Sequence, residues 1–237
     1  MWNETPSEHF VARHEDRDAS DAEGVLELLE ATRARLARAF AVVPAGVDVV
    51  LHGSDAQLLL ARPGVALERL VAAPAARRYV TGTWSKRELH VLAPRRLEER
   101  ASAVPGSREL VLLSPAGLYS RLVVGSSSRT LGSRRRARRL AWLAWGAAEW
   151  FSGQTAHARP AIARRLREGR SPASPPGRRD ARLLGGTVID LLVRERGEAE
   201  AVRLVDEGVL RHAFLGAPLR EIEERWREHL ERLVAAA

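Results

Sequence analysis

The segment that most constrains the fold is residues 140–151, whose side chains are apolar on almost every face of the helix that they predict. A helix that is hydrophobic all round is buried in the protein interior rather than laid on its surface. Ser133 is a suitable N-cap for this helix, and Arg134, Arg135 and Arg136 fill its first turn. We therefore expect a buried central helix that begins near Ser133 and carries basic residues at its N-terminal end.

The first half of the chain alternates between predicted strands and helices. Two S-x-x-E/Q capping boxes, which begin at Ser20 and Ser54, predict the starts of two helices, and residues 95–103 predict a third. Apolar and alternating runs predict five strands, of which the third and fourth form a hairpin: residues 9–14, 47–52, 78–83, 88–93 and 109–113.

Helices dominate the second half of the chain. Ser114 as N-cap and Pro115 as first residue predict a helix that reaches about residue 124, and residues 125–128 predict a loop. The pair Gly185-Gly186 would loosen its own helix unless a neighbouring element needs a close approach there. Apolar residues at helical spacing predict four more helices, over residues 160–167, 180–196, 198–206 and from Pro218 onward.

The end of the central helix carries a motif. Residues 142–153 read W-L-A-W-G-A-A-E-W-F-S-G, which resembles the W-L-x-E-G-L-A-E-Y-F-S-G helix of the peptidase MA-like gluzincins, zinc metallopeptidases of the HExxH type. The pattern P-L-R-E-I-E-x-x-W near the C-terminus resembles the helix that closes these domains. The resemblance implies an α+β fold, with a small mixed sheet and helices in residues 1–113 and a mostly helical subdomain in residues 114–237.

The residues that bind zinc in that family have no counterpart here. Trp145 stands where the family has the third zinc ligand, a glutamate, and no HExxH sequence occurs in the chain. On the preceding helix, Tyr119 and Val123 occupy the two histidine positions, and Ser120 occupies the position of the general base. Because zinc binds thiolate, imidazole or carboxylate groups, we expect no metal, no cofactor and no catalytic residue at these positions. We expect Tyr119 and Trp145 to pack together and fill the space between the two helices.

Two groups of residues are candidates for binding. Arg121 and Glu149 are expected to line the cleft in which the resembled peptidases hold their substrate, and a peptide or protein partner would bind there. Arg134, Arg135 and Arg136 form a basic cluster that would bind an acidic partner or a phosphate group, unless it is only a solvated surface next to a loop.

Charge and composition bear on the partners. The net charge is +8, and the basic residues are almost all arginine, which permits binding to nucleic acid or to an anionic membrane surface. The chain has no motif that reads nucleic acid bases, so we do not expect a nucleic acid partner. It contains no cysteine and no apolar run long enough to cross a membrane. The sequence as it stands predicts a cytoplasmic protein, or an extracytoplasmic one if an upstream segment has been removed, and leaves the oligomeric state open.

Three hypotheses of function follow. The first is a catalytically inactive, metallopeptidase-like protein, a pseudoenzyme that binds a peptide or protein or acts as a scaffold. The second is an active zinc-dependent peptidase or hydrolase with non-standard ligands. The third is a basic protein that binds nucleic acid or an anionic surface. We prefer the first, in which the chain is not an enzyme, because all three ligand positions have changed together.

Overall fold

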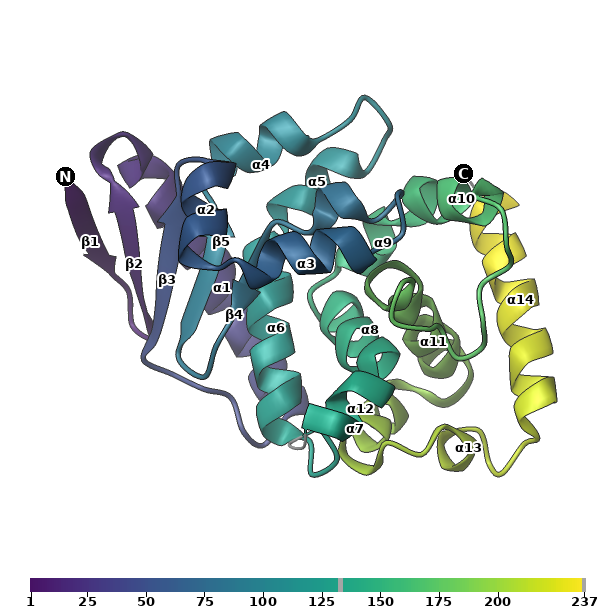
Figure 1. Cartoon of the computed structure of the whole chain (residues 1–237). Coiled ribbons are helices and arrows are strands. Elements are labelled where there is room, and N and C mark those ends of the chain that lie inside the picture. The colour runs from purple at the N-terminus through teal and green to yellow at the C-terminus, as the bar shows by residue number, and fades with distance from the viewer. Residues whose placement is uncertain (132–133, 236–237) are drawn as a thin grey trace.

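The protein has an α+β fold in which a mixed sheet lies at one end and helices form most of the remainder (Figure 1). The structure, a computed structural model, describes residues 1–131 and 134–235. The predicted fold class is therefore confirmed. Within the described residues, each helix is too short or too polar to span a lipid bilayer.

The sheet has five strands in the order β1-β2-β3-β5-β4. The three central strands run parallel to one another, and each edge strand is antiparallel to its neighbour. The inward-facing residues of β2 and β3 alternate with more exposed ones, so that one face is buried against helices. The strands are β1 (Trp2–Pro6), β2 (Phe10–Glu15), β3 (Val47–His52), β4 (Gly82–Trp84) and β5 (Glu88–Leu92).

Helices form the rest of the regular secondary structure in the described residues, together with two short 3-10 turns, η1 (Asp16–Asp18) and η2 (Arg77–Tyr79). In the first half these are α1 (Ala19–Ala39), α2 (Asp55–Ala61), α3 (Gly64–Val71), α4 (Pro94–Arg100) and α5 (Ser107–Leu112). In the second half they are α6 (Ser114–Ser127), α7 (Arg134–Arg139), α8 (Ala141–Phe151), α9 (Gln154–His157), α10 (Arg159–Arg167), α11 (Ala181–Arg196), α12 (Glu198–Glu207), α13 (Leu210–Ala213) and α14 (Leu219–Ala235).

Several sequence predictions need correction. The predicted strand at residues 109–113 is wrong, because this segment belongs to helix α5, and a short apolar run does not distinguish the two structures. Strand β1 and helices α3, α9 and α13 were not predicted, and most of the strand predicted at 78–83 is absent, because residues 77–79 form the turn η2. The predicted loop at 125–128 is largely helical, since α6 continues to Ser127. The single helix predicted from Ser133 onward is divided into α7 and α8, and Ser133 itself lies outside the described residues.

The predicted helix caps differ in outcome. Ser54 is the N-cap of α2, and its hydroxyl accepts a hydrogen bond from the amide of Gln57 at 3.2 Å. Ser20 is not a cap, because α1 already begins at Ala19. Ser114 is the first residue of α6 rather than its cap, and its hydroxyl donates to the carbonyl of Val111 at 2.5 Å.

Helix α8 is the buried central helix that the sequence predicts. It packs against α6 on one side and against α11 on another (Figure 1). At the crossing with α11, Gly146 faces Gly185 without side chains between the two backbones. An ideal Cβ on Gly146 would lie 2.3 Å from the carbonyl of Gly185, and one on Gly185 would lie 2.4 Å from the carbonyl oxygen of Trp142. Of the two interpretations that the sequence left open for Gly185-Gly186, the structure has the one in which a neighbouring helix approaches closely.

We predict that Gly185→Ala lowers the free energy of unfolding by about 1–3 kcal/mol, because its methyl group would force the two backbones apart. The matched control is Gly24→Ala, at an exposed position of helix α1 where an added Cβ meets no atom within 4 Å. This control should raise stability by about 0.5–1 kcal/mol through helix propensity alone. Urea denaturation of both variants measures the difference. Equal effects at the two positions would contradict the tight crossing.

Candidate functional site

Tyr119, Ser120 and Val123 lie in helix α6 and are fully buried. The ring of Tyr119 packs edge-on against Phe10 of the sheet, with 4.9 Å between the ring centroids. Its hydroxyl donates a hydrogen bond of 2.6 Å to the carbonyl of Pro44. Tyr119 therefore faces the sheet, and Val123, one helical turn later, is on the same side of α6.

Trp145 of helix α8 lies in a different environment. Its ring makes an edge contact with Trp84 of β4, with centroids 5.1 Å apart, and the guanidinium of Arg182 lies 3.8 Å from its centroid. The structure therefore does not bring Tyr119 and Trp145 together, and the predicted packing of these two residues is wrong. The side of α6 that faces α8 carries Leu118 and Arg121 instead.

Arginine and tryptophan side chains line an open cleft with a volume of about 300 Å³. We call it the Arg–Trp cleft. Helices α3, α6, α7, α8 and α11, strand β4 and the loop before α11 each contribute to it. Its polar and aromatic lining contains five arginines, two tryptophans and one carboxylate: Glu68, Trp84, Arg121, Arg138, Trp145, Arg178, Arg179 and Arg182. The cleft therefore has an excess of positive charge, with aromatic rings beside it.

Arg121 is buried in this cleft, with 8% of its surface exposed. Its guanidinium lies 4.7 Å from the ring centroid of Trp84 and 5.8 Å from that of Trp145, within the range of cation–π attraction. Its Nε is buried and has no hydrogen-bond partner among the described residues. Burial lowers the pKa of Arg121 to about 10, an effect that Glu68 opposes and Arg182 reinforces. Arg121 thus stays charged at pH 7 without an acceptor for its Nε–H.

Arg182 lies beside Arg121 but has partners. One of its terminal nitrogens donates to the carbonyl of Tyr79 at 2.8 Å, and the other lies 3.5 Å from a carboxylate oxygen of Glu68. Burial lowers the pKa of Arg182, whereas Glu68 and Glu149 oppose this shift. Arg182 is therefore fixed in place over the ring of Trp145.

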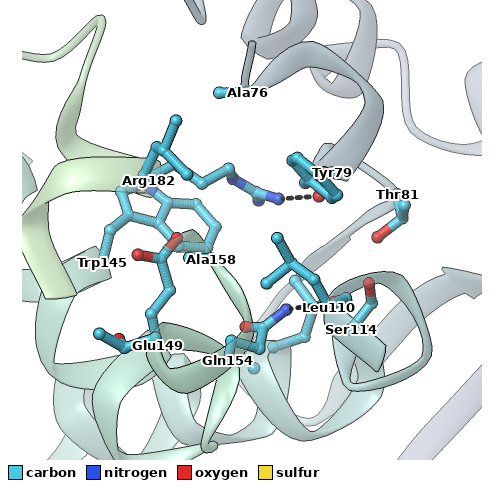
Figure 2. A pocket seen from close by; sticks show the side chains of 14 residues that line it. Ala76, Tyr79, Thr81, Leu110, Ser114, Trp145, Glu149, Gln154, Ala158 and Arg182 are labelled. Atoms are coloured by element: carbon cyan, nitrogen blue, oxygen red, sulfur yellow. Dashed lines mark hydrogen bonds between the residues drawn. The ribbon is translucent and has the colours of Figure 1, made fainter. Parts of the chain in front are cut away.

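Glu149 lies in a separate small cavity, which we call the Glu149 cavity. Figure 2 shows its carboxyl group next to the ring of Trp145, over which Arg182 extends to reach Tyr79. The cavity has a volume of about 20 Å³, which is room for about one water molecule. Its polar lining includes Ser114, Thr155 and Gln154, which lie in or next to helices α6 and α9.

Burial raises the pKa of Glu149 well above its ordinary value of 4.5, and Arg182 and the backbone amide of Gly186 oppose the shift. The environment thus favours the uncharged carboxyl group. Arg121 and Glu149, predicted to line one cleft, lie instead in two hollows that share Trp145 and Arg182 as lining residues. Only the hollow that contains Arg121 has room for a ligand larger than water.

Titratable residues elsewhere do not gather into a ligand set. Among residues 1–131 and 134–235, no group of three or more histidine, aspartate or glutamate side chains lies close enough together to hold a metal ion. At the positions that resemble the zinc site, Tyr119 and Val123 are packed toward the sheet, and Trp145 lines the Arg–Trp cleft.

The basic cluster of Arg134, Arg135 and Arg136 falls in helix α7. The side chain of Arg136 is exposed and lines an open depression beside Asp206 and Glu207. The side chains of Arg134 and Arg135 lie outside the described residues. Helix α7 does contribute to the Arg–Trp cleft, through Arg138.

Trp84 and Arg182 are functional candidates that the sequence alone did not indicate. Trp84 carried one usable signal, since a large aromatic residue is unusual in a hairpin turn, where glycine, asparagine and aspartate prevail. Arg182 carried no signal, because it is one of many arginines on predicted helices. Its role depends on the crossing of α8 and α11, which a single sequence does not reveal.

No protein-family model matches the chain, and neither a curated protein nor a solved structure matches it. The gluzincin resemblance therefore remains a prediction from the sequence of two helices. The structure itself establishes the α+β class and the geometry of the Arg–Trp cleft.

We predict that Glu149→Gln stabilises the protein at pH 7 and that this gain disappears as the pH falls toward 4. Because the pKa of Glu149 is raised in the folded state, the stability that its protonated form contributes is complete below 4.5 and is lost as the pH rises. Glutamine keeps the shape of the neutral carboxyl group at every pH. Urea denaturation between pH 4 and pH 8 measures the difference. The opposite result would be a Glu149→Gln variant that loses stability relative to wild type at pH 7 more than at pH 4. It would mean that Glu149 is ionised and bound to Arg182.

Proposed function

We propose that the protein is a binding module without peptidase activity, and that a peptide or protein segment binds in the Arg–Trp cleft. The observation that carries this proposal is Arg121, a charged side chain that lines the open cleft, is buried against two tryptophan rings, and has a buried Nε without a hydrogen-bond partner among the described residues. A buried charge without a hydrogen-bond partner is costly to folding. In this proposal, a ligand in the cleft supplies an acceptor to the guanidinium of Arg121.

The composition of the cleft supports a macromolecular segment as the ligand. Tryptophan and arginine are the residues most enriched among those that dominate binding energy at protein interfaces. The volume of about 300 Å³ is at the lower end of the range for ligand pockets, about 300–1,000 Å³. This space suits two or three side chains of a partner rather than a whole folded domain.

The absence of peptidase activity is proposed from the residues that stand at the ligand positions of the resembled family. Tyr119, Val123 and Trp145 have no thiolate, imidazole or carboxylate to offer a zinc ion, and Ser120 is a poor general base. The substrate cleft of an inactive relative would keep its ability to bind a peptide while losing the chemistry.

We predict that the protein binds members of a random peptide library, and that Trp84→Leu weakens the best binders at least tenfold. Loss of an aromatic side chain at the centre of an interface typically costs about 2 kcal/mol or more. Isothermal titration calorimetry measures the affinity. The matched control is Trp2→Leu, at an exposed tryptophan on the edge strand β1, which lies outside the Arg–Trp cleft.

A second measurement addresses catalysis. The purified protein should contain no stoichiometric zinc and should not hydrolyse casein, with or without added zinc. Tightly held zinc together with hydrolysis would overturn the proposal in favour of a metallopeptidase with non-standard ligands. Equal losses of affinity in the Trp84 and Trp2 variants, or a library without any binder, would also overturn it.

A further inference from the structure

We propose that the floor of the Arg–Trp cleft is a carboxylate-binding site, in which the guanidinium of Arg121 holds one carboxylate of the bound segment through paired hydrogen bonds. The proposal rests on the proposed function for its view that the ligand is a peptide. It goes further by naming the chemical group that the site recognises and the residue that recognises it.

The protein contains an internal example of how such an arginine is satisfied. Arg165 is also buried, and its Nε and one terminal nitrogen donate to the two carboxylate oxygens of Asp180, at 2.5 and 2.9 Å. This paired geometry is the strong form of an arginine–carboxylate interaction. Arg121 is similarly buried, yet among the described residues its Nε–H has no acceptor. A carboxylate like that of Asp180 would supply the paired acceptors that Arg121 lacks.

No carboxylate of the cleft takes this role. Glu68 is the acidic residue in the lining, and its carboxylate lies 3.5 Å from Arg182. Arg182 also donates to the carbonyl of Tyr79. Within the described part of the chain, no salt bridge joins Arg121 to an acidic side chain at 4.0 Å or less. One buried positive charge thus remains for a ligand, which matches the single negative charge of a carboxylate.

The head group of Arg121 suits paired hydrogen bonds to an anionic group. Trp84 and Trp145 meet at an angle of 87° beside its guanidinium. A planar carboxylate in the plane of the guanidinium pairs with it edge to edge through two hydrogen bonds. Phosphate can form the same paired bonds with arginine, so inorganic phosphate is the competing ligand in the test.

The rim of the cleft attracts the ligand. Arg138, Arg178 and Arg179 are exposed residues of the cleft lining. They raise the local positive potential and increase the rate at which an acidic segment arrives, an effect that salt weakens. Arg121 at the floor provides recognition of the carboxylate, because charges in a poorly hydrated site interact more strongly than exposed ones.

The test uses the full chain and four short peptides that differ only in carboxylates. Acetyl-tetra-alanine with a free C-terminus is compared with its amide, and acetyl-Ala-Ala-Glu-Ala-amide is compared with the same peptide containing glutamine. At least one carboxylate peptide should bind at least tenfold more tightly than its neutral counterpart. The pair that shows the difference tells whether a terminal or a side-chain carboxylate is the source. Equal binding within both pairs, or tighter binding of inorganic phosphate than of either carboxylate peptide, would overturn the proposal.

Variants of Arg121 assign the effect to this residue. Arg121→Gln should reduce the affinity for the carboxylate peptide at least tenfold, and Arg121→Lys should reduce it less, because the charge stays but the paired donors are lost. Arg220→Gln, at a position of α14 that is 90% exposed and lies outside the cleft, controls for net charge and should bind as wild type does. An unchanged affinity in Arg121→Gln would overturn the assignment.

Two further measurements separate binding from folding. In the wild-type protein, the Nε–H nuclear magnetic resonance signal of Arg121 should shift when the carboxylate peptide is added and stay in place when the neutral one is added. Arg121→Met should be more stable than wild type without ligand, because an apolar side chain replaces an incompletely paired buried charge. The contrary result is an Arg121→Met variant that is less stable than wild type, together with an Nε–H signal of wild-type Arg121 that does not shift when the carboxylate peptide is added. It would mean that Arg121 stabilises the fold and does not bind the carboxylate.

The outcomes also distinguish this proposal from the proposed function. Library peptides that bind in the cleft without any preference for carboxylates would overturn the carboxylate site and leave the binding module intact. Binding of acetate that depends on Arg121, in a protein that binds no peptide, would support the carboxylate site and overturn the peptide-binding function.

Discussion

The contact between the backbones of Gly146 and Gly185 is the constraint on which the rest of the structure depends. It brings α8 and α11 so close that a single methyl group on either glycine would collide with backbone atoms of the other helix. Trp145 immediately precedes one of these glycines, and Arg182 stands three residues before the other. The crossing thus places the indole of Trp145 under the guanidinium of Arg182, at 3.8 Å. The same pair of side chains lines the Arg–Trp cleft on one side and the Glu149 cavity on the other.

Much of the fold could be predicted from local patterns. The strands at 9–14, 47–52 and 88–93 and the long helices of the second half follow from periodicity, and the start of α2 follows from the cap Ser54. The strand predicted at 78–83 is correct only for its last two residues, which belong to β4. The errors have physical reasons. A run as short as 109–113 is too brief to show its period, so its helix was mistaken for a strand. The edge strand β1 is polar and largely exposed, and only its pairing with β2 makes it a strand.

The candidate site was predicted only in part, because it is built from long-range contacts. Arg121 was selected from the sequence, but its neighbours Trp84 and Arg182 come from a hairpin and a helix far away in the chain. The orientation of α6 about its own axis could not be predicted from the sequence. Every residue of that helix from Ser114 to Val124 is buried, so no polar stripe indicates which side faces the sheet. The side of α6 that carries Tyr119 was therefore inferred from a motif, which placed it toward α8. The packing of Phe10 against the ring of Tyr119 shows that this side faces the sheet instead.

The orientation of α6 has a consequence for any metal site engineered between this helix and α8. Histidines placed at positions 119 and 123 would point toward Phe10 and the sheet rather than toward α8, whose residue 145 would have to complete a metal site. To face α8, these side chains would require α6 to rotate about its axis, and a change of register by one residue corresponds to about 100°. The closely packed interior opposes such a rotation. Point mutation could introduce metal-binding side chains at these three positions while the backbone keeps them apart. The packing of α6 against the sheet, and not residue type alone, therefore decides whether these positions could hold a metal ion.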